Sequence, residues 1–152
     1  MIMSRAAMDP PEIEIFNDSL ARCLRDDQFF QRFYELFLAS SPEVREKFRA
    51  TDFRKQRRML QTSFYMVVEY IAVGWPECQA YLERIAEAHG KHGRDIPPYL
   101  YDLWLDCLLQ AVKELDAQYS TEVEAAWRFM MGAGISFLKS RYDRPATAPL
   151  VR

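Results

Sequence analysis

The chain has 152 residues, of which 49% are hydrophobic and 28% charged, and this balance fits one globular domain with a sizeable core. A formal net charge of -2, from 20 basic and 22 acidic residues, gives no electrostatic reason to expect nucleic acid or an anionic membrane as a partner. Cys23, Cys78 and Cys107 form no CxxC pair, which argues against a zinc cluster, and their odd number argues against a disulfide framework.

No segment has the apolar length of a signal peptide or a membrane span, so we expect a soluble, cytoplasmic protein. Only five glycines occur, and no stretch alternates apolar and polar residues as a half-buried strand does. The chain should therefore be all-helical. We expect a single domain over residues 1–152, with an ordered helical core at about 10–143 and a flexible tail over 144–152.

The first two expected helices cover residues 11–24 and 27–40. In the second helix, aromatic and apolar residues recur at helical spacing and form one stripe: Phe29, Phe30, Phe33, Tyr34, Phe37 and Leu38. Ser41, Pro42 and Glu43 then supply an N-cap, a proline at the first helical position and an acid in the first turn. A short third helix should begin there, and the chain should bend.

Four more helices are expected beyond this bend. One runs from 52 to about 73, and the next from 76 to about 89, where a loop rich in glycine and proline follows. The last two cover about 98–116 and 121–143, and Thr121 with Glu124 has the pattern of a capping box at the start of the final helix.

Histidine is the scarcest candidate ligand, because His89 and His92 are the only two in the chain. His89 continues the apolar face formed by Leu82, Ile85 and Ala86, so its imidazole should point into the interior, whereas His92 lies in the following loop. A buried neutral imidazole needs a partner at each ring nitrogen, and a metal at one with an acceptor at the other satisfies both. A hydrogen-bonded core histidine is the alternative interpretation.

The spacing of several residues resembles the globin family, and in particular the bacterial single-domain globins and the globin domain of flavohaemoglobins. Phe33 and Tyr34 are followed by Pro42 eight residues after the tyrosine, and by Phe48 six residues after the proline. This order is similar to the family's distal tyrosine, its corner proline and the phenylalanine that packs on haem. The resemblance implies a three-over-three helical sandwich that encloses haem b.

The remaining matches concern the two sides of the implied haem pocket. Gln56 and Leu60, one helical turn apart, look like the family's distal glutamine and the apolar residue that follows it, and Ile85 with His89 resembles the proximal helix. The resemblance implies that His89 ligates the iron. It implies these cofactor contacts: His89, Phe33, Tyr34, Phe48, Gln56, Leu60, Ile85, Ile96, Tyr101 and Trp104.

The resemblance also implies a function. A pentacoordinate iron would bind dioxygen, nitric oxide or carbon monoxide at its sixth position. Tyr34 and Gln56 would donate hydrogen bonds to a bound ligand, which favours dioxygen over carbon monoxide and would support nitric oxide dioxygenation with an external reductase. Two other functions stay open, namely a haem-based gas sensor and a haem-free helical interaction module, and so does the oligomeric state.

Departures from the family's spacing leave some assignments open. The segment before Gln56 is shorter than in flavohaemoglobins, so Arg57 or Met59 could stand in its place. The loop after the proximal helix is longer, which keeps His92 open as a second candidate ligand. Tyr142 falls near the place of the acidic residue that flavohaemoglobins carry beside the proximal histidine, so we do not expect their peroxidase-like charge network.

Overall fold

The structure is a computed structural model that describes residues 10–144. Within that range it holds seven helices and no strand: α1 (Pro11–Leu24), α2 (Phe29–Ser40), α3 (Pro42–Lys47), α4 (Phe53–Ala72), α5 (Pro76–His89), α6 (Tyr99–Leu115) and α7 (Thr121–Ser140). Most bounds agree with the expected ones to within the usual ambiguity of helix ends, but α7 ends before residue 143. Apart from its first residue, the expected tail at 144–152 lies outside the described residues. Among the described helices, none combines the length and apolar character needed to cross a membrane.

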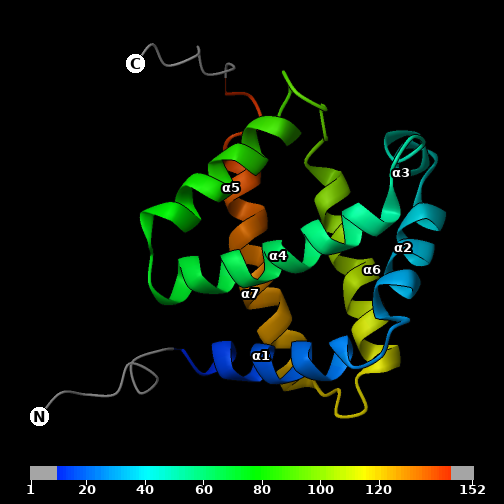
Figure 1. Cartoon of the computed structure of the whole chain (residues 1–152), viewed down its shortest axis with the longest axis vertical. Coiled ribbons are helices and arrows are strands. Elements are labelled where there is room, and N and C mark those ends of the chain that lie inside the picture. The colour runs from blue at the N-terminus through cyan, green and yellow to red at the C-terminus, as the bar shows by residue number, and fades with distance from the viewer. Residues whose placement is uncertain (1–9, 145–152) are drawn as a thin grey trace, which may run out of the picture.

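The helices pack in two layers. Helix α1 packs on α7, α2 packs on α6, and α4 contacts both α5 and α7, which are themselves in contact. In Figure 1, α4 and α5 pass in front of α7, and α1 crosses the lower end of the molecule. Helices α1, α4 and α5 thus cover α2, α6 and α7, and the short α3 leads from α2 toward α4. This confirms the three-over-three helical sandwich expected from the sequence.

Local capping interactions explain where several helices begin. The side chain of Ser41 caps α3 as expected, and the Asp52 carboxylate caps α4 by accepting from two backbone N–H groups of the first turn. The capping box predicted at Thr121 is wrong by one residue. Ser120 has the extended backbone of an N-cap, with φ -154° and ψ 173°, and its hydroxyl accepts from the N–H of Val123, whereas Thr121 is already helical.

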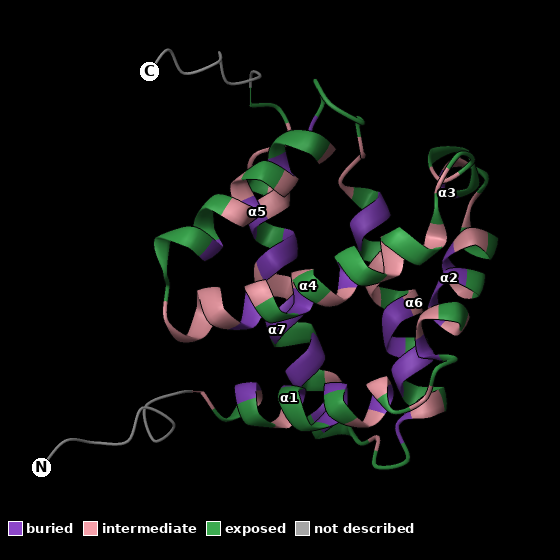
Figure 2. Ribbon diagram, viewed as in Figure 1, coloured by how far each residue is buried: buried purple, intermediate pink, exposed green. Residues whose placement is uncertain are grey.

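The core is centred on the crossing of α1, α4 and α7. Phe16 and Trp127 are fully buried there with ring centroids 4.6 Å apart, and Phe64 lies 5.8 Å from Trp127. Such edge-to-face aromatic pairs contribute packing beyond the area that they bury. Figure 2 shows the buried residues as purple bands on α1, α4, α6 and α7. The aromatic stripe of α2 packs against α6 through Phe33, whose ring centroid is 5.9 Å from that of Trp104.

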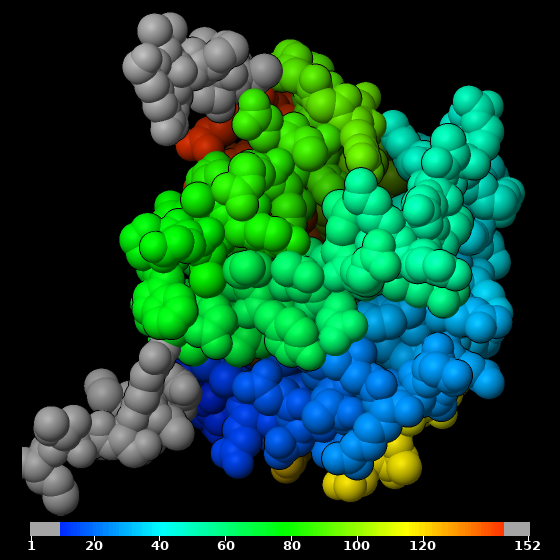
Figure 3. All heavy atoms as spheres, viewed as in Figure 1, coloured from blue at the N-terminus to red at the C-terminus, as the bar shows by residue number. Residues whose placement is uncertain are grey.

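One face of the molecule is closed in its lower half and hollowed above. In Figure 3 the blue atoms of α1 and α2 pack closely against α4. Higher up, the surface is hollowed between the cyan segment that leads into α4 and the yellow-green segment that connects α5 to α6. The hollow therefore lies between the segment that precedes α4 and the loop that connects α5 to α6.

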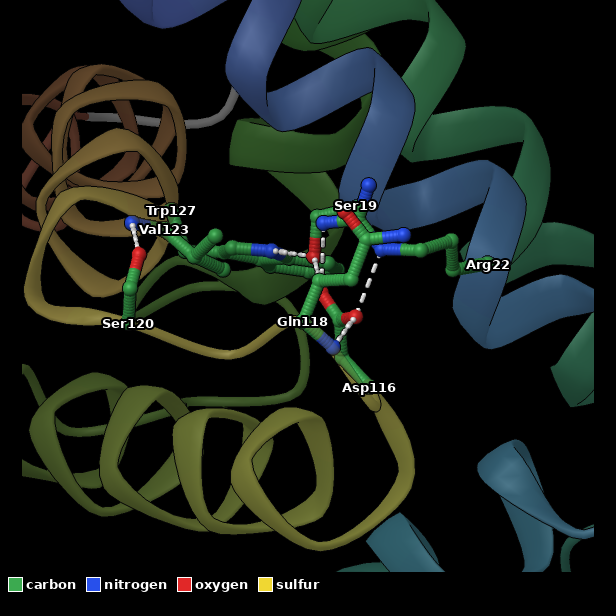
Figure 4. Close-up of polar contacts among 7 residues, drawn as sticks. All are labelled: Ser19, Arg22, Asp116, Gln118, Ser120, Val123 and Trp127. Atoms are coloured by element: carbon green, nitrogen blue, oxygen red, sulfur yellow. Dashed lines mark hydrogen bonds and ion pairs between the residues drawn. The ribbon is translucent and has the colours of Figure 1, made fainter.

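A polar network that the sequence analysis missed ties α1 to the turn between α6 and α7 (Figure 4). The buried carboxylate of Asp116 accepts hydrogen bonds from Ser19 Oγ at 2.6 Å, from Arg22 Nε at 2.6 Å and from the backbone N–H of Gln118 at 2.9 Å. Ser19 in turn accepts from Trp127 Nε1 at 2.9 Å. Burial raises the pKa of Asp116, but the bonds from Arg22 and Ser19 outweigh it and hold this pKa below its ordinary value. The carboxylate therefore stays ionised at neutral pH.

Candidate functional site

His89 lies at the end of α5 with its two ring nitrogens in different environments. Nδ1 is 2.8 Å from the carbonyl oxygen of Ile85, one helical turn earlier. Because a carbonyl can only accept, Nδ1 carries the proton and Nε2 carries the lone pair. No group of residues 10–144 forms a hydrogen bond to Nε2. Burial lowers the pKa of His89, the bond to Ile85 opposes this, and the charge of Arg94 lowers the pKa further. The imidazole is therefore neutral and has a nitrogen available for a metal.

The backbone around His89 is held on both sides. Ala86, one turn earlier, is buried at 2% exposure and turns this face of α5 inward. The carbonyl of His89 accepts from the N–H of Ile96, which folds the following loop back onto the helix end. A Cβ added at Gly90 would lie 3.2 Å from the carbonyl oxygen of Tyr142, so the chain passes close to the end of α7 there. The backbone next to His89 is therefore closely packed against the residues that follow α7.

The other candidate groups of this region do not reach His89. His92 is exposed in the loop after α5. The hydroxyl of Tyr142 donates to the carboxylate of Asp95, which is exposed and lies in the same loop. The hydrogen-bond acceptor for His89 is therefore a neutral backbone carbonyl and not a carboxylate.

A second group of side chains gathers around Tyr34 on α2. Tyr34 is only 4% exposed, and its ring centroid is 6.0 Å from that of Phe48 and 5.3 Å from that of Phe53. Burial raises the pKa of Tyr34 to about 12, while the nearby Gln56 side chain and the positive charge of Arg57 act in the opposite direction. The phenol therefore stays protonated, and it can donate a hydrogen bond beside Gln56.

Most other predicted contacts belong to the main core or pack against it. These are Phe33, Tyr34, Phe48, Leu60, Ile96 and Trp104. Tyr101 is buried but lies outside this cluster, and burial raises the pKa of its hydroxyl to about 12. Ile85 is half-buried, also lies outside the cluster, and supplies the carbonyl that orients His89.

The structure also bears on the alternatives to Gln56. Met59 is 47% exposed, whereas Arg57 is half-buried and has its Nε atom buried without an acceptor. Phe53 was missed by the sequence analysis, although its place three residues before Gln56 puts both on one helical face and could have identified it. Nothing in the sequence pattern predicts that Arg57 Nε is buried.

These residues limit how a metal could be held. In the described part of the chain, no group of three or more histidine, cysteine or acidic side chains is arranged to bind a metal ion. His89 could serve as one ligand of a metal whose other ligands come from a bound cofactor. A separate recess at the turn between α4 and α5 contains no histidine and is lined by Met66, Glu69, Trp75, Pro76, Glu77 and Cys78.

Comparison with known proteins gives one match to a solved structure. It is the crystal structure of PA3967 from Pseudomonas aeruginosa PAO1, a protein described as structurally highly homologous to a human hemoglobin. The two sequences are 40% identical over 87% of this chain and 98% of that chain, and the structures superpose with a TM-score of 0.81. No protein-family model matches the chain. No curated protein matches it either.

Proposed function

Because the chain belongs to the same globin-like family as PA3967, we propose that it holds haem b through His89 and binds dioxygen or another diatomic gas at the haem iron. The observation that carries this proposal is the state of His89, whose Nδ1 donates to the Ile85 carbonyl and whose Nε2 lone pair has no partner among residues 10–144. A metal on one ring nitrogen and an acceptor on the other is the usual arrangement of a ligating histidine.

The residues around Tyr34 also fit a haem. The rings of Phe48 and Phe53 offer apolar surface, and Leu60 is buried in the same cluster. Tyr34 and Gln56 supply the polar groups there, and both can donate hydrogen bonds. A flat, largely apolar cofactor whose metal His89 would bind would fit these groups.

Haem iron with one axial imidazole leaves a sixth position at which a diatomic gas can bind reversibly. Tyr34 and Gln56 would donate hydrogen bonds to a polar ligand such as dioxygen, and the adjacent rings of Phe48 and Phe53 would keep water from that ligand. Carbon monoxide is less polar and gains less from the same donors. His89 donates to a neutral carbonyl and so keeps its own proton, which favours reversible binding of the gas over its reduction.

Nitric oxide is a further ligand for the same position. The donors Tyr34 and Gln56 would also support nitric oxide dioxygenation, for which an external reductase would have to supply electrons. The lifetime of the oxygen complex and nitric oxide turnover in the presence of a reductase distinguish this activity from a sensing role.

The test is the absorption spectrum of the purified protein after haem reconstitution, in ferric, reduced and carbon monoxide forms. We expect one haem per chain and a Soret band that His89→Gly shifts and added imidazole restores. His92→Ala is the matched control because His92 is exposed, and it should leave the spectrum unchanged. Circular dichroism verifies that both variants remain helical. Failure of the folded wild-type protein to take up stoichiometric haem would favour the haem-free helical module instead.

A further inference from the structure

Within residues 10–144, the charged side chain of Arg57 contains a buried donor atom that forms no hydrogen bond. It lies on the first half of α4 and is half-buried, while its neighbours Arg54 and Arg58 are exposed. Its Nε is the one buried side-chain nitrogen or oxygen of residues 10–144 that has no hydrogen-bond partner. Buried donors are nearly always paired in proteins, so a donor left without an acceptor points to a partner from outside the chain.

The location of Arg57 indicates where that partner would lie. Its positive charge acts on the phenol of Tyr34, which the neighbouring side chain of Gln56 also affects. Arg57 forms no ion pair with any carboxylate of residues 10–144, in contrast to Arg22, which binds Asp116. A phenol, an amide and a guanidinium therefore lie near one another, and no carboxylate of residues 10–144 pairs with the guanidinium.

We propose that the ligand side of this site selects small monovalent anions, of the class of azide, nitrite and hydrosulfide, and that Arg57 determines this selectivity. The inference rests on the proposed haem function, because the anion would bind at the ferric iron opposite His89. An anion would give the buried Nε an acceptor and would offset the unpaired charge. A carboxylate of the cofactor is the other source of an acceptor, but the position of Arg57 beside Tyr34 and Gln56 favours the ligand.

The experiment compares Arg57→Gln with Arg58→Gln in the haem-loaded protein. The two variants each remove one arginine charge, at neighbouring positions of α4. Only Arg57 is half-buried and has a buried Nε without a partner. Azide is titrated into the ferric form at roughly neutral pH (7.5 ± 0.5), where Tyr34 stays protonated. Carbon monoxide is titrated into the reduced form. We expect Arg57→Gln to weaken azide binding by about 10- to 100-fold and to leave carbon monoxide affinity within about 3-fold of wild type.

A second measurement uses the haem-free protein. Replacing Arg57 with methionine removes the unpaired donor and keeps an unbranched side chain, so Arg57→Met should raise the melting temperature. A residue that served only the fold would show the reverse. In the haem-loaded protein, the infrared stretch of bound azide should shift in Arg57→Gln and stay at its wild-type frequency in Arg58→Gln.

The outcomes separate the two proposals. If the wild-type protein takes up no haem, the proposed function itself fails. If it takes up haem and binds carbon monoxide, but Arg57→Gln and Arg58→Gln bind azide equally well, the gas-binding function stands and the anion selectivity is refuted. If Arg57→Gln loses haem affinity while its azide affinity is unchanged, Arg57 serves a carboxylate of the cofactor and the proposal is overturned.

Discussion

Replacing Asp116 with asparagine should destabilise the fold without touching the proposed haem site. The change keeps the shape of the side chain but removes the charge that Arg22 and Ser19 contact at 2.6 Å. The carboxylate side chain is fully buried, while Arg22 is 19% exposed and can turn partly toward water. Breaking a fully buried ion pair costs about 3–5 kcal/mol, whereas an exposed pair contributes about 0–1 kcal/mol. Because only one partner of this ion pair is fully buried, we expect Asp116→Asn to lower the free energy of unfolding by about 2–3 kcal/mol.

The assay is urea denaturation followed by circular dichroism, with Asp102→Asn as the control. Asp102 also forms an ion pair, with Lys139 at 2.9 Å, but its side chain is 67% exposed. Its replacement should cost less than about 0.5 kcal/mol. The expected loss at Asp116 corresponds to a fall in melting temperature of roughly 4–12 °C for a domain of this size.

The destabilisation should also depend on pH in a defined direction. The folded-state pKa of Asp116 lies below its ordinary value, so its ionised form stabilises the fold above about pH 4. That contribution is lost as the pH falls through the folded-state pKa, and the difference between wild type and Asp116→Asn should narrow there. The reasoning is refuted if Asp116→Asn costs no more than Asp102→Asn at pH 7, or if the difference widens in acid.

Two other predictions concern single hydroxyl groups. In the haem-loaded protein, Tyr34→Phe should speed dioxygen release about 10-fold in stopped-flow measurements, because a donated hydrogen bond of about 1–1.5 kcal/mol is lost; an unchanged rate would mean that the phenol does not contact the ligand. Ser120→Ala should lower the free energy of unfolding by about 1 kcal/mol in urea titrations, and Thr121→Ala by clearly less, because only Ser120 caps α7. Equal losses at the two positions would contradict the assigned cap.

The expected helix pattern was accurate where it depended on local signals. The aromatic stripe of α2 and the Ser41-Pro42 start of α3 depend on residues within one or two turns of each other. The same locality explains the error at α7, where Ser120 and Thr121 are both acceptable caps by residue type. The backbone conformation of Ser120 decides between them, and that conformation depends on how the preceding turn packs.

The candidate site was predictable in part for the same reason. The phase of His89 on the apolar face of α5 indicated an inward imidazole, and its hydrogen bond to Ile85 spans a single helical turn. The association of Tyr34 with Gln56 joins two different helices, so it came from the resemblance to globins and not from periodicity. The buried Nε of Arg57 depends on how α4 packs in the tertiary structure and could not be predicted from its own segment alone.

The sequence by itself determined the all-helical class, the helix order and which face of each helix turns inward, because these follow from contacts three or four residues apart. Only the tertiary structure decided which polar groups share a partner. Ser19 and Asp116 are 97 positions apart and each is an ordinary polar residue in its own segment, yet they meet at 2.6 Å in the interior. Burial makes such pairing necessary, since an unpaired charge there is costly, but the choice of partner depends on how the two layers cross.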